Sequence, residues 1–300
     1  MKVSDFSDAE VSHYAAVTVA DLADRLRAVG YEPRRPELLA LAGALARPAG
    51  AAGARALLLE GPPGAGKSAL AEAAARVLGA PLVVGQLHAW SDADELFVGV
   101  DVAAAVAGDA AAVRQDGVLA VAARSSQEHP MTVLLLDEVD KTPERAEALL
   151  LDWLQSGRVP VAPGRHLVTR HERLLVVLTS NGQRPLGDAL LRRCRRVVMA
   201  PLPADQQAGL VAARARCALG VARLLVRLAH EVGEATGAVI SLQEITHAAA
   251  ELVVARDLAD AREILAGWLA RDEAGRAVVR RSQRAAAVWG EYVASTREGR

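Results

Sequence analysis

Short apolar runs alternate with helical patterns through the middle of the chain. The runs are ALLLE (56–60), PLVVG (81–85), MTVLLLD (131–137), RLLVVLTS (173–180) and RRVVMA (195–200). Runs of this length, separated by helical stretches, are typical of parallel strands covered by helices. We therefore predict an α/β nucleotide-binding domain, built on a parallel sheet, over residues 36–203.

The two ends of the chain predict helices only. In the segment 17–30 four apolar residues fall on one helical face, and they are Val19, Leu22, Leu26 and Val29. Gly30 then ends the pattern. After Pro203 the strand signal disappears. We expect a helical appendage over 1–35 and a helical lid domain with a charged C-terminal helix over 204–300.

Composition excludes some classes of partner. The 35 basic and 36 acidic residues give a net charge of −1, so no global field draws the chain to nucleic acid or an anionic membrane. No apolar run reaches the roughly 18 residues of a membrane helix, and the N-terminus lacks the features of a signal peptide. Cys194 and Cys217 have no partner at metal-ligand spacing. These features predict a cytoplasmic protein with reduced thiols.

The segment GPPGAGKS (61–68) carries the strongest chemical signal. It matches the phosphate-binding pattern G-x-x-x-x-G-K-[ST] and lies between a predicted strand and a predicted helix, which is the context this motif requires. Glycines let backbone N–H groups point at phosphate oxygens, and the helix N-terminus adds a positive field. Lys67 would reach the β- and γ-phosphates of a nucleoside triphosphate, while the Ser68 hydroxyl would bind Mg²⁺. The alternative is a plain Gly/Pro turn. The residues expected to contact nucleotide are Gly61, Pro62, Pro63, Gly64, Ala65, Gly66, Lys67, Ser68 and Ala69.

Lysine usage supports this interpretation. Only three of the 35 basic residues are lysines, namely Lys2, Lys67 and Lys141, and the others are arginines. Together with abundant alanine, this indicates a coding bias toward GC-rich codons. A lysine at the motif position in such a chain favours a specific role for it.

The segment TVLLLDEVDK (132–141) supplies two adjacent carboxylates at the end of an apolar strand. Open α/β sheets bind their ligands at the carboxyl ends of strands. Asp137 suits the Mg²⁺ beside Ser68, and Glu138 could polarise an attacking water. The alternative is a charged, solvated turn. For Asp140 and Lys141 we expect turn or subunit-surface charges.

The segment LLVVLTSN (174–181) is another apolar strand that ends in polar residues. If this strand lies between the first strand and the carboxylate strand, Asn181 could hydrogen-bond the water that Glu138 activates. An ordinary turn residue is the alternative for Asn181.

The series GPPGAGKS, LLLDEVDK, LTSN and ALLRRC resembles, in order and spacing, the core of AAA+ ATPases, and specifically their MoxR branch. The segments 87–102 and 179–197 are also similar to sequences of that branch, and the resemblance covers about residues 35–270. It implies a five-stranded sheet of order 5-1-4-3-2, a helical lid, ATP and Mg²⁺ as ligands, and assembly into a homo-oligomeric ring, a hexamer. Family members act as chaperone-like remodellers, often with a von Willebrand factor A domain partner.

The resemblance also gives a role to the basic segment RRCRR (192–196). In the family, an arginine after the sensor strand reaches the γ-phosphate bound by the neighbouring subunit, where it stabilises the transition state. The match identifies Arg193, with Arg192 as the second candidate, whereas Arg195 and Arg196 open the next strand as surface or interface charge. A solvated basic edge is the alternative for all four.

Two places depart from the family pattern or extend it. Gln243 occupies the position of a lid arginine that normally contacts the phosphates, so Arg223 or another lid arginine would have to replace it. The segment 158–170 predicts a hairpin around Pro163 and Gly164. Its basic side chains, Arg165, His166 and Arg170, could touch a substrate in the ring pore, or they could belong to an ordinary exposed hairpin.

Three functions follow from these residues. The first is an ATP-driven remodeller of a partner protein complex. The second is a nucleic-acid motor or a transposition or restriction helper, which the near-neutral charge and 3% aromatic content make less favourable. The third is a scaffold that binds ATP without turnover, which needs none of the chemistry of Glu138, Asn181 and Arg193.

Overall fold

The computed structural model describes residues 18–47, 53–89, 96–100, 106, 114–162 and 164–298. Part of the segment 87–102, and residues 1–17 of the predicted appendage, lie outside the described residues. The chain divides into two compact units. One comprises the residues up to Gly61 together with Gly66–Met199, and the other comprises Pro62–Ala65 together with Ala200–Arg300.

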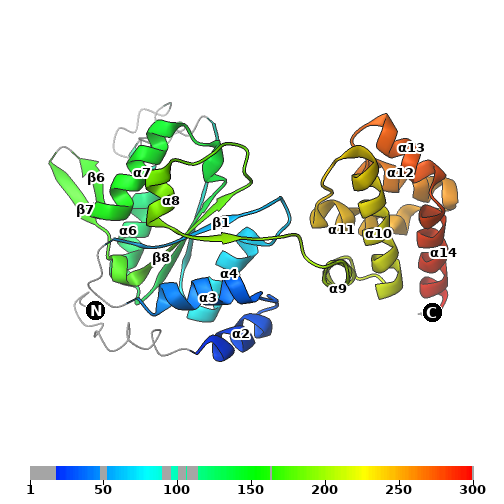
Figure 1. Cartoon of the computed structure of the whole chain (residues 1–300), viewed down its shortest axis with the longest axis horizontal. Coiled ribbons are helices and arrows are strands. Elements are labelled where there is room, and N and C mark those ends of the chain that lie inside the picture. The colour runs from blue at the N-terminus through cyan, green and yellow to red at the C-terminus, as the bar shows by residue number, and fades with distance from the viewer. Residues whose placement is uncertain are drawn as a thin grey trace. The chain divides into compact units, whose positions relative to one another are not determined.

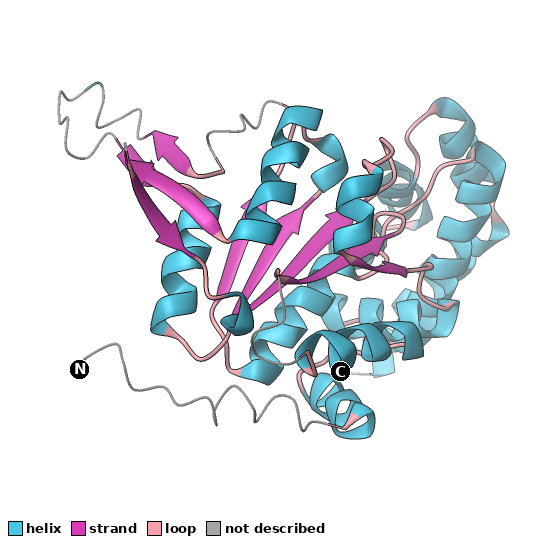
Figure 2. Cartoon of the chain, turned by 60° about the vertical axis from the view of Figure 1, so that its left-hand side comes forward, coloured by secondary structure: helices cyan, strands magenta, loops and turns pink. Residues whose placement is uncertain are grey.

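The first unit is built on a five-stranded parallel sheet (Figures 1 and 2). Its strands are β1 (Arg55–Glu60), β2 (Leu82–Gln86), β5 (Thr132–Asp137), β8 (Leu174–Ser180) and β9 (Arg195–Val198). They lie in the order β2-β5-β8-β1-β9, and every neighbouring pair is parallel. Counted along the chain, this order is 5-1-4-3-2, so the expected fold class is confirmed.

The central strands are nearly continuous apolar runs because helices cover both faces of the sheet. On one face, side chains such as Leu58, Leu134 and Val176 join a core that α6 (Val118–Glu128) and α7 (Glu144–Ser156) complete. On the opposite face lie α3 (Arg35–Leu45) and α4 (Lys67–Leu78) (Figure 1). The central strands are therefore held rigidly, and their carboxyl ends form a fixed edge.

The helix predicted near the N-terminus is present as α2 (Val19–Ala28). Thr18 caps it by accepting a hydrogen bond from the Asp21 backbone. Leu22 and Leu26 are fully buried because α2 packs on α3 and α4. Val19, predicted on the same face, is 39% exposed at the helix start. The described part of the N-terminal segment is thus packed into the first unit.

Two small antiparallel hairpins accompany the sheet. The predicted one consists of β6 (Arg158–Ala162) and β7 (Arg165–Val168). The other, β3 (Val98–Val100) with β4 (Arg114–Asp116), was not predicted, because its strands are too short for an alternating pattern to stand out. The remaining short elements are η1 (Val139–Lys141), η2 (His171–Arg173) and α8 (Asp188–Arg193).

In the second unit the described residues after position 200 form helices only, as the sequence predicts. Several begin at a side-chain cap, for example Ser241, whose hydroxyl accepts the Glu244 N–H while Glu244 accepts the Ser241 N–H. The apolar faces of these helices enclose one core, and helix α10 (Leu219–Thr236) contacts most of the other helices. The helices are α9 (Ala204–Ala215), α10 (Leu219–Thr236), α11 (Leu242–Glu251), α12 (Leu258–Leu269), α13 (Glu273–Arg281) and α14 (Gln283–Glu298), with η3 (Leu252–Val254) after α11.

Across the described parts of both units, no helix combines the length and the apolar character needed to cross a membrane.

Candidate nucleotide-binding site

The loop of residues 61–66 joins β1 to α4 and ends in a left-handed glycine. Gly66 has φ 93° and ψ 16°, a conformation that residues with a side chain rarely adopt, and Lys67 follows as the first residue of α4. The first N–H groups of a helix have no intrahelical acceptor, so the start of α4 presents donors and a positive dipole end. Pro63 and Gly64 are exposed, Ala65 is buried, and Pro62, Ser68 and Ala69 are partly buried. The loop therefore has the form of an anion-binding turn.

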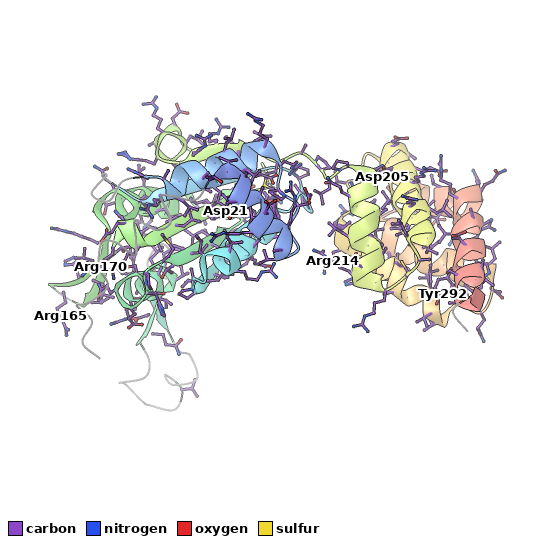
Figure 3. All side chains as sticks on the ribbon, turned by 90° about the horizontal axis from the view of Figure 1, so that it is seen from below. Asp21, Arg165, Arg170, Asp205, Arg214 and Tyr292 are labelled. Atoms are coloured by element: carbon purple, nitrogen blue, oxygen red, sulfur yellow. The ribbon has the colours of Figure 1, made fainter. Side chains whose placement is uncertain are left out.

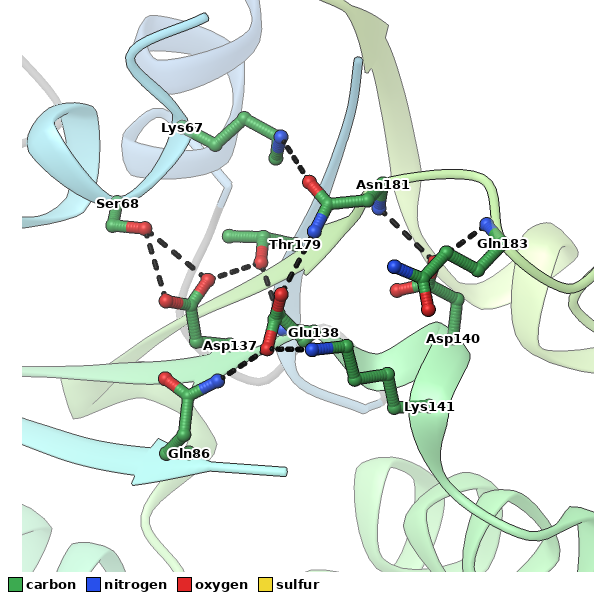
Figure 4. A network of polar contacts seen from close by, with 10 residues as sticks. All are labelled: Lys67, Ser68, Gln86, Asp137, Glu138, Asp140, Lys141, Thr179, Asn181 and Gln183. Atoms are coloured by element: carbon green, nitrogen blue, oxygen red, sulfur yellow. Dashed lines mark hydrogen bonds and ion pairs between the residues drawn. The ribbon is translucent and has the colours of Figure 1, made fainter. Parts of the chain in front are cut away.

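Lys67 is the buried cation of the site. It is 6% exposed, and its Nζ donates to the Gly61 carbonyl and to Asn181 Oδ1, each at 2.7 Å (Figure 4). Burial lowers its pKa, while the charges of Asp137, Asp140 and Glu138 oppose that shift. The structure thus places a desolvated ammonium group between the loop and the end of β8.

Ser68 and Asp137 face one another across the sheet edge. The Ser68 hydroxyl lies 3.1 Å from both carboxylate oxygens of Asp137, and the Thr179 hydroxyl donates to Asp137 Oδ1 (Figure 4). Strand register explains the meeting, because β8 lies between β1 and β5 and all three end at the same edge. A hydroxyl and a carboxylate are oxygen donors of the kind Mg²⁺ prefers. Among the described residues, no group of three or more His, Cys, Asp or Glu forms a metal cluster.

Glu138 points away from its neighbour. Its backbone is left-handed, with φ 59° and ψ 47°, where β5 gives way to η1. This conformation is uncommon outside glycine and costs of order 1–3 kcal/mol, and it is frequent at functional sites. The Thr179 hydroxyl accepts the Glu138 N–H at 2.9 Å, and Asn181 Nδ2 donates to Glu138 Oε1 at 2.9 Å. Consecutive carboxylates are thereby turned to different partners.

Two contacts of Glu138 were not predicted from the sequence. Gln86 Nε2 and Lys141 Nζ each lie 2.7 Å from Glu138 Oε2. The hydrogen bond to Glu138 raises the pKa of Lys141. Gln86 ends the edge strand β2 and lies opposite Asp137 in the strand register, which places it beside Glu138. An amide at the end of an apolar strand is too common for the residue type alone to reveal this contact.

The expectation that Asp140 is a surface charge is wrong. It is 2% exposed, and its Oδ2 accepts the backbone N–H groups of Asn181 at 3.2 Å and Gln183 at 2.8 Å. The two N–H groups that donate to Oδ2 stabilise the buried carboxylate. Lys141, expected to be of the same kind, instead pairs with Glu138 and is 34% exposed along its side chain.

The arginines of the basic segment 192–196 lie on the surface. Arg192 and Arg193 are exposed at the end of α8, and Arg193 Nη2 donates to Gln155 Oε1 at 2.8 Å. Arg195 and Arg196 are also exposed, and Arg196 pairs with Glu60 at 2.8 Å. Cys194 between them is buried, which raises the pKa of its thiol to about 12.

The remaining predicted side chains belong to the β6–β7 region and to the second unit. Arg165 of the β6–β7 hairpin and Arg170, which follows the hairpin, are both exposed (Figure 3). His166 is exposed as well. In the second unit, Gln243 is exposed near the start of α11, and Arg223 lies 3.8 Å from Asp205.

The sheet order, the loop before α4 and the two carboxylates at the end of β5 together define a P-loop nucleotide-binding domain of the α/β class. The comparison with known families agrees, since residues 56–194 match the family model of the AAA domain of the dynein-related subfamily. Residues 56–194 therefore have the fold of an AAA domain. No curated protein matches the chain in sequence.

Proposed function

We propose that this protein is a ring-forming, MoxR-like ATPase that hydrolyses ATP with Mg²⁺ in order to remodel or activate a partner protein complex. The observation that carries the proposal is the divergence of two consecutive carboxylates. Asp137 faces Ser68, whereas Glu138 faces Asn181. A site that only bound nucleotide would not need a second carboxylate oriented by an amide.

The residues present fit Mg²⁺ and a triphosphate. Ser68 and Asp137 would hold the ion, since nucleotide-bound Mg²⁺ takes one or two protein oxygens and completes its shell with phosphates and water. The ion supplies neutralisation of charge on the phosphates. Lys67 would bind the β- and γ-phosphates as a compact cation, with the loop 61–66 around them.

Glu138 is the proposed general base. A carboxylate at this position can take a proton from an attacking water, and Asn181 can hold both the carboxylate and the water in place. The existing bond from Asn181 to Glu138 supports that role, and so does the bond from Asn181 to Lys67. One amide thus connects the phosphate-binding lysine to the base.

Arg193 is the proposed in-trans residue, with Arg192 as the alternative. Both lie exposed at the end of a short helix, where a neighbouring subunit can be reached. A guanidinium supplied to the transition state is worth roughly 10³–10⁵ in rate where it has been dissected. Exposure at the surface is required for this role. A solvated basic edge shares that exposure, so the assignment depends on the subunit-mixing experiment described in the Discussion.

The remaining parts of the proposal follow from the family resemblance. They are a hexameric ring and a von Willebrand factor A domain protein as a partner, while the proposed cytoplasmic location comes from the composition of the chain. The β6–β7 hairpin with its exposed Arg165, together with Arg170 just after it, is the element we propose to contact the remodelled protein.

The proposal is tested by Glu138→Gln and Lys67→Ala. We expect Glu138→Gln to keep ATP affinity and to lose hydrolysis by about 10²–10⁴-fold, the usual contribution of a general base. Lys67→Ala should lose ATP binding itself. Calorimetric titration and phosphate release measure the two effects. Unimpaired hydrolysis by Glu138→Gln would reject Glu138 as the base, and a wild-type protein without turnover would leave only the scaffold function.

A further inference from the structure

The segment 181–187 connects the nucleotide site to the helix that carries the arginines. It begins at Asn181, at the end of β8, and it ends at Gly187, from which α8 starts. It has no regular secondary structure, so its backbone groups bond to water or to side chains rather than to a helix or sheet ladder. Two buried carboxylates accept N–H groups of the segment, one near each end.

Asp140 holds the first end. Its Oδ2 accepts the N–H groups of Asn181 and Gln183 at 3.2 and 2.8 Å (Figure 4). The carboxylate is in the turn directly after β5, and it is 2% exposed. The backbone of Asn181 is therefore hydrogen-bonded to the turn that directly follows Glu138.

Glu147 of α7 holds the second end. Its side chain is 9% exposed, Oε1 accepts the Gly187 N–H at 2.5 Å, and Oε2 accepts Arg184 Nη2 at 2.9 Å. Arg184 Nη2 also donates to the Thr142 carbonyl at 3.0 Å. A Cβ added to Gly187 would lie 2.7 Å from Glu147 Oε1, so an alanine at this position would displace that carboxylate oxygen.

Helix α8, which starts from Gly187, makes few other contacts that could fix its orientation. α8 is six residues long, and Leu190 is its one buried residue. The Gly187 carbonyl accepts the Leu190 and Leu191 N–H groups at 3.0 and 3.1 Å, so holding Gly187 also holds the first turn of α8. At the other end of α8, Arg193 donates to Gln155. Glu147 and Gln155 both belong to α7, which thus contacts both ends of α8.

We propose that Asp140, Glu147 and Arg184 are positioning residues that hold the segment 181–187 against η1 and α7, and so set the position of α8 and its arginine. This inference rests on the proposed function, because the role of Arg193 belongs to that proposal. A displacement of about 1 Å in such a residue can reduce turnover on the order of 10²-fold without removing any group that touches substrate. Glu147 and Arg184 would therefore affect kcat through Arg193, and Asp140 would affect it through Asn181.

Amide hydrogen exchange tests the physical contact without relying on activity. The variants are Glu147→Gln, Arg184→Ala and Gly187→Ala. Gly187 has φ −63°, which alanine adopts freely, so the effect of that variant comes from the displaced carboxylate. We expect exchange within 181–193 to rise about 10-fold or more while the rest of the unit keeps its protection. The control is Arg25→Ala, which breaks an exposed ion pair with Asp21 in α2 and should leave this segment unchanged.

Kinetics test the consequence for hydrolysis. We expect each of the three variants to keep ATP affinity within about threefold and to lose kcat on the order of 10²-fold. The double variant Arg184→Ala/Arg193→Ala should be no slower than Arg193→Ala alone, because both changes would remove the same contribution.

Two outcomes would overturn the inference: unchanged exchange across 181–193, or a rise spread evenly over the whole unit, which would indicate general destabilisation. Multiplying losses in the double variant would show that Arg184 does not act through Arg193, and would overturn the coupling. If the wild-type protein does not hydrolyse ATP, the proposed function fails, and exchange alone decides whether the carboxylates hold the segment.

Discussion

At the scale of single residues, the burial of Lys67 changes its protonation, and with it both stability and phosphate binding. Its ammonium group is buried between a carbonyl and an amide oxygen, and burial lowers its pKa below the ordinary 10.5. A lowered pKa in the fold means that the folded chain holds this proton less tightly than the unfolded chain. The unfavourable effect on stability is present below the folded pKa and disappears as the pH rises from there to 10.5. Phosphate binding requires the charged form, so it has the opposite dependence on pH.

ATP affinity should therefore begin to fall at a pH clearly below 10.5, and each ATP bound in that range should take up a proton. Affinity measured between about pH 7 and pH 10 checks this expectation. Tyr31 and Cys194 do not account for such a fall, because burial raises the pKa of Tyr31 and brings that of Cys194 to about 12.

Lys141→Met is the matched control for this dependence on pH. The hydrogen bond to Glu138 raises the pKa of Lys141, so removal of Lys141 should leave the fall in affinity where it was. Constant affinity over the whole range would contradict the assignment of the proton to Lys67.

At the scale of elements, helix α2 shows how packing decides the contribution of a segment to stability. Its sequence alone indicates an amphipathic helix, without saying what the apolar face contacts. In the fold Leu26 is fully buried against α3 and α4, whereas Val19 on the same helix is 39% exposed. The helix supports α4, which carries Lys67 and Ser68 at its start.

Leu26→Ala should lower the free energy of unfolding of the first unit by about 2–5 kcal/mol, because it removes buried methyl groups and leaves a cavity. Val19→Ala, the control on the same helix, should change it by less than about 0.5 kcal/mol. Chemical denaturation followed by circular dichroism measures both. Equal effects of the two substitutions would mean that α2 does not pack as described.

At the scale of the whole molecule, the proposed site needs a residue from a second copy of the chain. Lys67→Ala removes the nucleotide from a subunit but leaves its Arg193 available to a neighbour. Arg193→Ala does the reverse. Lys67→Ala alone should not hydrolyse ATP and Arg193→Ala alone should keep only a small residual rate, and this reciprocity allows the in-trans role to be tested.

Mixing the two inactive variants in equal amounts should restore hydrolysis, since about a quarter of the interfaces in a randomly mixed ring would combine an intact lysine with an intact arginine. Phosphate release measures the recovery. Mixing Arg193→Ala with the double variant Lys67→Ala/Arg193→Ala is the control, because no arginine is then available. Proven mixed rings without recovery would count against an arginine acting across subunits.

The sequence alone determined the main strands and the principal polar residues. The apolar runs predicted all five strands of the sheet to within a few residues, and the signal was strongest in the three central strands, which are buried on both faces and apolar almost throughout. The phosphate-binding motif and the carboxylate pair could be recognised in the sequence because the chemistry of phosphate and Mg²⁺ permits few residue types at fixed spacing. The strand order came from the family resemblance, and the sheet agrees with it.

Only the tertiary structure decided which side chains meet. Gln86 donates a hydrogen bond to Glu138, the buried Asp140 accepts the Asn181 N–H, and Glu147 accepts the Gly187 N–H. Glutamine, aspartate and glutamate are ordinary at strand ends and on helices, so their types carry no signal. Their roles depend on contacts between residues 40 or more positions apart in the chain, and the register of the parallel strands and the packing of α7 on the sheet create these contacts.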